Sequence, residues 1–432
     1  MTKGRVAKTV FVNGLRIVSE TLLDRDSVAI GVWVEVGSRH EEPDVAGVSH
    51  FLEHMVFKGT QTRSAREIAL SLERLGGMLN AFTTREHTCY HARILGENLP
   101  QAVDVLADLA TRARLPAAEV RKERKVIAEE IKDVQDTAHE HIHDLFAEQV
   151  WPGHPIGRPV AGTLETVAAT TRAALGSHRR AFYRPDRIVV AASGGLAHDH
   201  LTRLVRRHFH LPRPTSPARP MASPDGLAPR RGVNARDIKQ THVCIGVPTW
   251  AFADRRRYAT LVTNSVLGGG MSSRLFQTVR ERRGLVYTIS AFHDSFQDTG
   301  FFAVYFACDP RQVVKAINLV LAEMGRLSRQ TVPPVELHDA KSQLRGNLLL
   351  GLESTSARMH RLARHELYLG RQIPPRATMK AIEGVRAAEL VALAREAFTP
   401  DRVALSILGP VDEAVLDQID WNKLGVRARR RG

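Results

Sequence analysis

The sequence predicts a duplicated protein of two domains, each built from strands and helices. The chain has 432 residues, and because a typical domain holds about 100 to 200 residues, this length predicts two or more domains. "SVAIGVWV" (27–34) recurs as "HVCIGVPT" (242–249), and "LADLATRARLPAAEV" (106–120) recurs as "LAEMGRLSRQTVPPVEL" (321–337). The two repeated pairs lie nearly the same number of residues apart, which indicates an internal duplication.

A change of composition marks the boundary between the two copies. The stretch "LPRPTSPARPMASPDGLAPRRG" (211–232) is rich in proline, and such a stretch sustains neither a helix nor a central strand. We therefore predict an N-terminal domain at 1–211, a linker at 212–232 and a homologous C-terminal domain at 233–432.

The elements of the first half follow in order from local signals. Asn13-Gly14, between two alternating runs, predicts a hairpin. Ser64 and Glu67 form a capping box for a helix that ends at the Gly76-Gly77 pair. The remaining signals predict a strand at 27–38, a helix from Val45 to Phe57 with Gly59 as its stop, a strand at 78–95, and helices at 100–115 and 116–136.

Composition narrows the class of protein. With 43% hydrophobic and 25% charged residues the chain is globular. No stretch approaches the roughly 18 apolar residues of a membrane helix, and the N-terminus lacks the apolar core of a signal peptide. Cys89, Cys244 and Cys308 are far apart and form no C-x-x-C pair, which is typical of a reducing compartment, so we expect a cytoplasmic protein.

The formal net charge of +15 raises the alternative of a nucleic-acid-binding protein. The arginines are scattered over both halves and crowded at the linker and in the tail "VRARRRG" (426–432). Aromatic residues make up only 6% of the chain, and no nucleic-acid fold motif is present. We expect a solvated basic surface or acidic partners instead.

The segment "HFLEH" (50–54) carries the strongest chemical signal. On a helix, His50 and His54 lie on one face, so both imidazoles can bind one metal ion. Glu53 lies beside this pair and is better placed to hold a water molecule than to bind the metal. A catalytic zinc site needs a third protein ligand, and either Glu129 or Glu130 of the later helix could provide it. A chance match on a half-buried helix is the alternative interpretation.

The second copy lacks this motif. At the same offset, the three residues of the motif correspond to Ser265, Gly268 and Gly269, and Glu130 corresponds to a position near Asn347. The sequence therefore predicts one active site per chain.

Four segments together resemble one protein family. "GVSHFLEHMVFKGT" resembles the signature of the inverzincins of the pitrilysin and insulinase family, whose H-x-x-E-H motif inverts the usual order. The resemblance is greatest to the branch that contains the mitochondrial processing peptidase beta subunit and its bacterial relatives. The other segments, in family order, are "LGGMLNAFTTREHTCY", "EVRKERKVIAEEIKD" and "SSRLFQTVRERRGLVYTISAF".

The resemblance implies one zinc ion per chain and a role for each residue of the site. His50, His54 and Glu130 match the family's zinc ligands, which selects Glu130 over Glu129. Glu53 matches the general base. Glu123 matches an auxiliary glutamate that supports the zinc site.

Two further groups of residues match family positions that contact the substrate. Arg280 and Tyr287 match a pair that steadies the bound peptide and the developing oxyanion. Asn80, Ala81 and Phe82 match the edge strand to which a substrate adds itself as a further strand.

The resemblance also implies a fold, an activity and an assembly. We expect an α+β protein of two homologous domains, each a mostly antiparallel sheet with helices packed against it. We expect an endopeptidase that hydrolyses short or unstructured peptides inside a clamshell chamber. Full-length members of the family have four such domains, so this chain is expected to form a homodimer with sites shared between chains. The alternative is a non-catalytic structural or assembly subunit; such relatives typically have damaged zinc ligands, which this chain does not.

Other histidines have simpler interpretations. His139, His141 and His143 in "AHEHIHD" are predicted to lie on a solvated helix face, with a second metal site as the alternative. His87 and His91 are expected to be structural.

Overall fold

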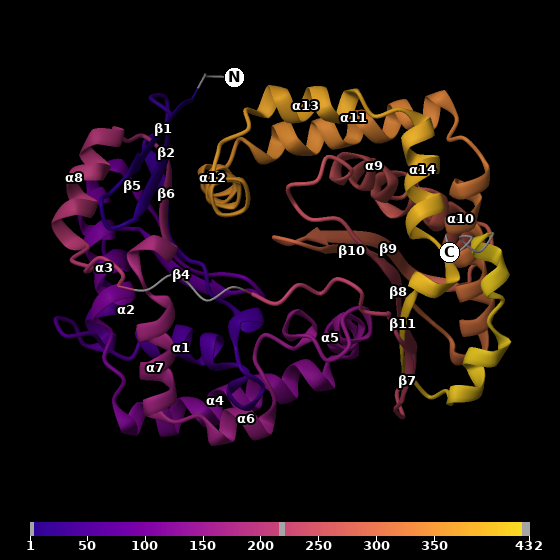
Figure 1. Ribbon diagram of the computed structural model, residues 1–432, viewed down its shortest axis with the longest axis horizontal. Helices are drawn as coiled ribbons and strands as arrows, with labels where there is room; N and C mark the ends of the chain where they lie inside the picture. Colours follow the sequence, from indigo (N-terminus) through magenta and orange to yellow (C-terminus); the bar gives the residue numbers. More distant parts are fainter. Residues whose placement is uncertain (1–3, 216–220, 426–432) are drawn as a thin grey trace. The chain divides into compact units, whose positions relative to one another are not determined.

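The computed structural model describes residues 4–215 and 221–425. The tail at 426–432 and the middle of the predicted linker lie outside the described residues. The chain forms two compact units, and each contains one sheet covered by helices (Figure 1). The α+β class is therefore confirmed. No helix among the described residues is both long enough and apolar enough to span a membrane.

The sheet of the first unit has six strands in the order β1-β2-β6-β3-β5-β4. Its neighbouring strands are antiparallel apart from β2 and β6, which are parallel. Gly14 adopts φ +96° between β1 and β2, so the predicted hairpin is confirmed. The strands are β1 (Arg5–Val10), β2 (Arg16–Thr21), β3 (Ser27–Val34), β4 (Met78–Thr83), β5 (Thr88–Leu95) and β6 (Ile188–Gly194).

The helices of this unit include the predicted capped helix. Ser64 Oγ accepts from the backbone N–H of Glu67 and Glu67 Oε2 accepts from the N–H of Ser64, which confirms the capping box. The helices are α1 (Val48–Val56), α2 (Ala65–Glu73), α3 (Leu99–Arg112), α4 (Ala117–Asp136, which continues into the second unit), α6 (Leu164–Ala169), α7 (Arg172–Phe182), α8 (His198–His208) and α12 (Thr355–Leu369).

Two local predictions were wrong. The segment 78–95 is a hairpin and not one strand, because the chain turns at Thr84, whose Oγ1 bonds to the backbone of His87. The turn "TREH" contains no glycine or proline that would have signalled it. Helix α1 begins at Val48 and not at Val45, because Gly47 adopts φ +90°.

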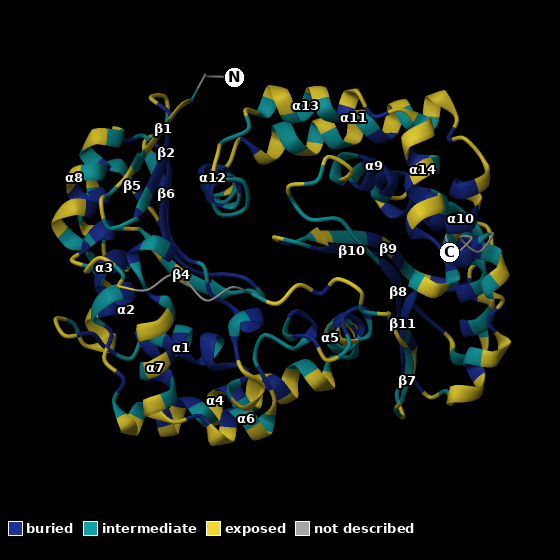
Figure 2. Ribbon diagram, in the orientation of Figure 1, coloured by how far each residue is buried: buried dark blue, intermediate teal, exposed yellow. Residues whose placement is uncertain are grey.

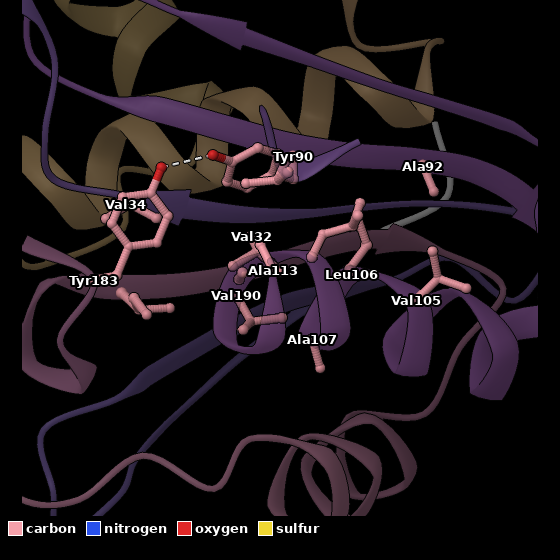
Figure 3. Close-up of a cluster of buried hydrophobic side chains, with 14 of the residues drawn as sticks. Val32, Val34, Tyr90, Ala92, Val105, Leu106, Ala107, Ala113, Tyr183 and Val190 are labelled. Atoms are coloured by element: carbon pink, nitrogen blue, oxygen red, sulfur yellow. Dashed lines mark hydrogen bonds between the residues drawn. The ribbon is translucent and has the colours of Figure 1, made fainter. Parts of the chain in front are cut away.

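The central strands of the first sheet, β3 and β6, are buried on both faces, and alternate residues of β3 contribute to each face. Val32 and Val34 belong to a large core with Tyr90, whose hydroxyl lies 2.6 Å from that of Tyr183 (Figure 3). Trp33 and its neighbours on the other face pack against α12. This second cluster consists of Val18, Ala29, Trp33, Cys89, Val189 and Ala191 of the sheet with Met359, Leu362 and Ala363 of α12.

The second unit repeats this topology. Its sheet has the order β7-β11-β8-β10-β9, with β7 and β11 parallel and the other neighbours antiparallel, so it matches β2-β6-β3-β5-β4 strand for strand. The predicted duplication is confirmed. The elements are β7 (Arg231–Ala235), β8 (Thr241–Thr249), β9 (Val286–Ser295), β10 (Gly300–Cys308), β11 (Ala404–Gly409), α5 (Ala138–Val150), α9 (Arg257–Gly268), the π-helical turn η6 (Phe276–Glu281), α10 (Val313–Arg329), α11 (Pro334–Gly351), α13 (Pro375–Glu383) and α14 (Ala387–Ala397).

Each unit takes one helix from the other half of the sequence. Helix α12, from the second half, packs on β2, β3 and β6, whereas α5, from the first half, packs on β8 and β11 (Figure 1). The central strands of both sheets are consequently buried on both faces (Figure 2). The first unit comprises Met1–Asp133, Arg158–Ala222 and Leu350–Gln372, and the second comprises Val134–Gly157, Ser223–Leu349 and Ile373–Gly432. The domain boundaries at 211 and 233 stay a prediction about where one copy of the duplication ends and the other begins. The compact units are divided differently, because each unit includes a helix from the other copy.

The packing of α5 corrects the prediction of a solvated histidine face. His139 is exposed, but the ring of His143 lies 5.0 Å from that of Phe292 and 5.4 Å from that of Tyr305. His143 therefore contributes to the contact between α5 and the sheet.

Candidate metal centre

The apolar residues of helix α1 pack into the core, so three polar side chains lie on the opposite side of the helix. His50, Glu53 and His54 are only partly buried. The opposite stripe of the helix is apolar and buried, with the spacing of three and four residues that an amphipathic helix requires. It consists of Val48, Phe51, Leu52, Met55 and Val56.

Helix α4 brings two glutamates to the same region. Glu123 and Glu130 are seven residues apart, so they lie on one side of the helix, two turns from each other. Glu123 is buried, whereas the side chain of Glu130 is 46% exposed. Glu129 is exposed and its carboxylate pairs with Lys132, 2.7 Å away.

The three predicted zinc ligands converge. One Glu130 oxygen lies 3.7 Å from His50 Nε2 and the other lies 3.6 Å from His54 Nε2. The three ligand atoms lie within 4.8 Å of one another. Ligands of tetrahedral zinc at about 2.0–2.1 Å are about 3.3 Å apart, so this set fits the ion after small side-chain rotations. In the described part of the chain, no other group of three His, Cys, Asp or Glu side chains comes this close.

A second set of contacts orients His54. Its Nδ1 lies 3.1 Å from Glu123 Oε1, and the other oxygen of Glu123 lies 2.7 Å from Lys58 Nζ. A carboxylate at Nδ1 favours the tautomer that carries its proton there, which leaves the Nε2 lone pair free for a metal. Glu123 therefore orients the candidate ligand His54. Lys58, which the sequence did not single out, holds Glu123 in turn.

His50 is held neutral by its surroundings. Burial is the larger cause and the neighbouring His54 the smaller one, and together they lower the pKa of His50 to about 4. A neutral imidazole keeps the lone pair that a metal ligand needs.

Glu53 is oriented by strand β4. Its Oε2 accepts a hydrogen bond of 2.8 Å from the hydroxyl of Thr83, the last residue of β4. Burial raises the pKa of Glu53, against the opposing effects of this hydrogen bond and of His54. A carboxylate of raised pKa beside a metal site is suited to accept a proton and to return it.

Strand β4 is the edge of its sheet and carries the predicted substrate-binding residues. The backbone N–H of Ala81 donates to Asn80 Oδ1 at 2.8 Å, and one side of β4 has no neighbouring strand in the sheet. Phe82 lies on the face of β4 toward α12, where its ring stacks on His360 at 5.6 Å. His87 and His91 belong to the same aromatic group, in agreement with the structural role expected for them.

Arg280 and Tyr287 lie in the second unit. Arg280 is in the π-helical turn η6, and its guanidinium lies 4.6 Å from the ring centre of Phe276 and 5.7 Å from that of Tyr287. Tyr287, on β9, is 78% exposed. Irregular helical turns of this kind are frequent at functional sites.

The second copy has a neutral network where the first has its ligands. Ser265 Oγ donates to Gln343 Oε1 at 2.6 Å, and Gln343 Nε2 donates to the carbonyl of Gly269 at 2.9 Å. Gly268 lies so close to β9 that a Cβ there would be 2.4 Å from the backbone nitrogen of Ala291. This copy therefore has no room for a catalytic carboxylate at that position.

Models of two protein families match the chain. The model described as insulinase (peptidase family M16) matches residues 16–164, and the model described as the peptidase M16 inactive domain matches residues 169–344. The division agrees with the ligand set of the first copy and the neutral network of the second.

Two bacterial relatives and one solved structure match this chain over nearly their full lengths. An uncharacterized zinc protease of Mycobacterium tuberculosis is 42% identical over 408 residues, covering 93% of each chain. The uncharacterized zinc protease YmxG of Bacillus subtilis is 38% identical over 398 residues, covering 92% of this chain and 97% of its own. The crystal structure of a protease from Helicobacter pylori has the same fold, with a TM-score of 0.89 and 23% identity over 94% of this chain and 100% of that chain.

Proposed function

We propose that this chain, which belongs to the insulinase family of peptidases (peptidase family M16), is a zinc-dependent endopeptidase with one zinc ion per chain. One observation carries the proposal: His50, His54 and Glu130 converge within 4.8 Å, with Glu53 held beside them. The intact ligand set favours an enzyme over a structural subunit. The cytoplasmic location expected from the sequence stays a prediction.

The residues of the first unit have distinct tasks in this reaction. Zinc held by His50, His54 and Glu130 would supply Lewis acidity to the scissile carbonyl and lower the pKa of a water molecule at the open position. Glu53 takes the proton from the attacking water and passes it to the leaving amine. Thr83 holds the Glu53 carboxylate in place through their hydrogen bond.

Strand β4 is the proposed binding site for the peptide. An extended substrate pairs with the free backbone groups around Ala81, and Asn80 releases the amide that it covers in this structure. Strand addition draws its affinity from the backbone of the substrate, so it requires an unfolded segment and constrains its sequence weakly. Folded proteins are therefore expected to be poor substrates.

Arg280 and Tyr287 are proposed to complete the site by donating to the developing oxyanion, as preorganised donors do in other acyl-transfer enzymes. We propose that they act on the zinc site of a second copy of the chain in a homodimer. A closed two-fold pairing would form two such sites.

Hydrolysis of an unstructured peptide tests the proposal. The purified chain should cleave a random-coil peptide, lose this activity when a chelator removes its metal, and regain it on addition of one equivalent of zinc. A stably folded protein of similar composition should remain intact under the same conditions. Cleavage that persists in the metal-free protein would contradict the proposal.

A further inference from the structure

Helix α1 begins at a residue that cannot cap it. Its N-cap is Gly47, which has φ +90° and no side chain to accept from the first backbone amides. A Cβ at this position would lie 2.4 Å from the carbonyl oxygen of Ala161, so no capping residue such as serine or aspartate fits there. The free amides at the start of α1 must find an acceptor elsewhere.

Glu41 supplies that acceptor from the segment just before the helix. Its Oε2 accepts from the backbone N–H of Gly47 at 2.6 Å, and its Oε1 accepts from that of Ser49 at 2.7 Å. Glu41 is only 4% exposed, and it follows the short 3-10 turn η1 (Ser38–His40). A buried carboxylate at a helix N-terminus also interacts favourably with the helix dipole.

A second contact holds the same turn of the helix from another side. Ser49 Oγ lies 3.0 Å from Nε2 of His178, which is buried on α7. Burial lowers the pKa of His178 to about 4, so its imidazole is neutral in this contact. Ser49 is therefore held at both its amide and its hydroxyl, and the next residue is the candidate ligand His50.

We propose that Glu41 is a positioning residue of the zinc site, and that Ser49 and His178 assist it. By fixing the first turn of α1, Glu41 sets the place from which the His50 imidazole reaches the metal. Metal sites require their ligands to be held within about 0.5 Å of the productive geometry. The inference rests on the zinc-peptidase function proposed above.

Metal binding without substrate tests this inference. The test compares wild type with Glu41→Gln by competition with a chelator, and by the visible absorption of Co²⁺ bound in place of zinc, which reports ligand geometry. Glutamine keeps the shape of glutamate but has one acceptor oxygen, so one α1 amide loses its partner. We expect zinc to bind about tenfold more weakly, as for other outer residues that orient metal ligands, and the Co²⁺ bands to shift.

Glu20→Gln is the matched control. Glu20 is also a buried carboxylate of the first unit, but it pairs with Arg358 of α12 at 2.7 Å. Its replacement is expected to lower the stability of the fold while leaving zinc affinity and the Co²⁺ spectrum unchanged. If zinc affinity fell only because the fold was less stable, it would fall in both variants. If Glu41 positions the ligand, zinc affinity falls only in Glu41→Gln.

The outcomes separate this inference from the proposed function. If wild type binds no zinc, the proposed function is wrong and the inference falls with it. If wild type binds zinc and Glu41→Gln binds it with the same affinity and spectrum, the positioning role is wrong and the function stands. If Glu41→Gln does not fold, Glu41→Asp decides: its side chain is one methylene shorter, so its carboxylate cannot reach both amides, and zinc should bind roughly threefold more weakly from the loss of one hydrogen bond. Unchanged zinc binding by Glu41→Asp would overturn the inference in that case.

Discussion

At the scale of single residues, the candidate site consists of the reacting and metal-binding side chains and of the side chains that orient them. His54 is held by Glu123, which Lys58 holds in turn, and Glu53 is held by Thr83. These supporting contacts come from α4 and from β4, so the geometry at α1 depends on two other elements. Changes in the supporting residues should therefore alter the site without removing any of its reacting groups.

Lys58→Met is predicted to weaken zinc binding. The ammonium group keeps the nearly buried Glu123 carboxylate in place, and its loss frees Glu123 to move away from His54 Nδ1. Removal of an outer partner of this kind lowers metal affinity by about 10- to 100-fold. Lys122→Met is the control, because Lys122 is 70% exposed and pairs with Glu119 at the surface of α4, the helix that carries Glu123. Equal zinc affinity in the two variants would contradict the role assigned to Lys58.

Thr83→Val and Thr83→Ser are predicted to differ in kcat. Valine keeps the shape of threonine but removes the hydroxyl that donates to Glu53, whereas serine retains it. Loss of one hydrogen bond to a charged group is worth about 1.5–3 kcal/mol, so Thr83→Val should lower kcat by roughly 10- to 100-fold while zinc content stays at the wild-type level. Thr83→Ser should stay close to wild type. A Thr83→Val enzyme with unchanged kcat would show that Glu53 needs no such support.

The sequence predicted the reacting residues better than their supports. The H-x-x-E-H spacing on one helix places His50 and His54 together by local geometry alone. Periodicity could not choose between Glu129 and Glu130, which the family resemblance did. Lys58 and Thr83 act through contacts with residues distant in the sequence, and no local pattern marks such contacts.

At the scale of elements, the exchange of α5 and α12 was the main feature that the sequence did not indicate. The continuous apolar run of β3 is typical of a strand with both faces buried, and the structure buries both. Nothing in that run identifies the helix that covers the second face. In the structure it is α12, more than three hundred residues away in the sequence.

Leu362→Ala is predicted to destabilise the first unit although it lies in the second half of the sequence. Leu362 is 1% exposed and packs in the cluster between α12 and the first sheet. Removal of such a side chain costs about 2–5 kcal/mol. Leu350→Ala is the matched control, because Leu350 is 74% exposed, and its loss should change stability by less than about 0.5 kcal/mol. Urea unfolding measures both, and equal midpoints would mean that α12 does not stabilise the sheet.

At the scale of the whole molecule, the duplication preserved the fold and changed the chemistry. The two five-stranded cores match strand for strand, including the single parallel pair, as the repeated segments predicted. Where the first copy has His50 and Glu53, the second has Ser265, bonded to Gln343, and Gly268, packed tightly against β9. The sequence alone could predict this asymmetry, because the loss of ligands is visible by aligning the two copies.

The proposed sharing of sites between chains predicts complementation. Glu53→Gln chains and Tyr287→Phe chains should each be inactive as homodimers. After equal mixing and subunit exchange, half of the dimers would be mixed and half of their sites intact, which gives roughly a quarter of wild-type activity for a two-fold interface. If native mass spectrometry shows mixed dimers and activity stays at the level of the separate variants, Tyr287 does not act on the site of its partner.

The most direct test of the zinc-peptidase account is the turnover of an unstructured peptide by Glu53→Gln, measured together with its zinc content. The substitution removes the proposed base but none of the ligands His50, His54 and Glu130. The account predicts one zinc ion per chain and a loss of turnover of about 10²- to 10⁴-fold, the usual contribution of a general base. Wild-type turnover by a zinc-loaded Glu53→Gln protein would contradict it.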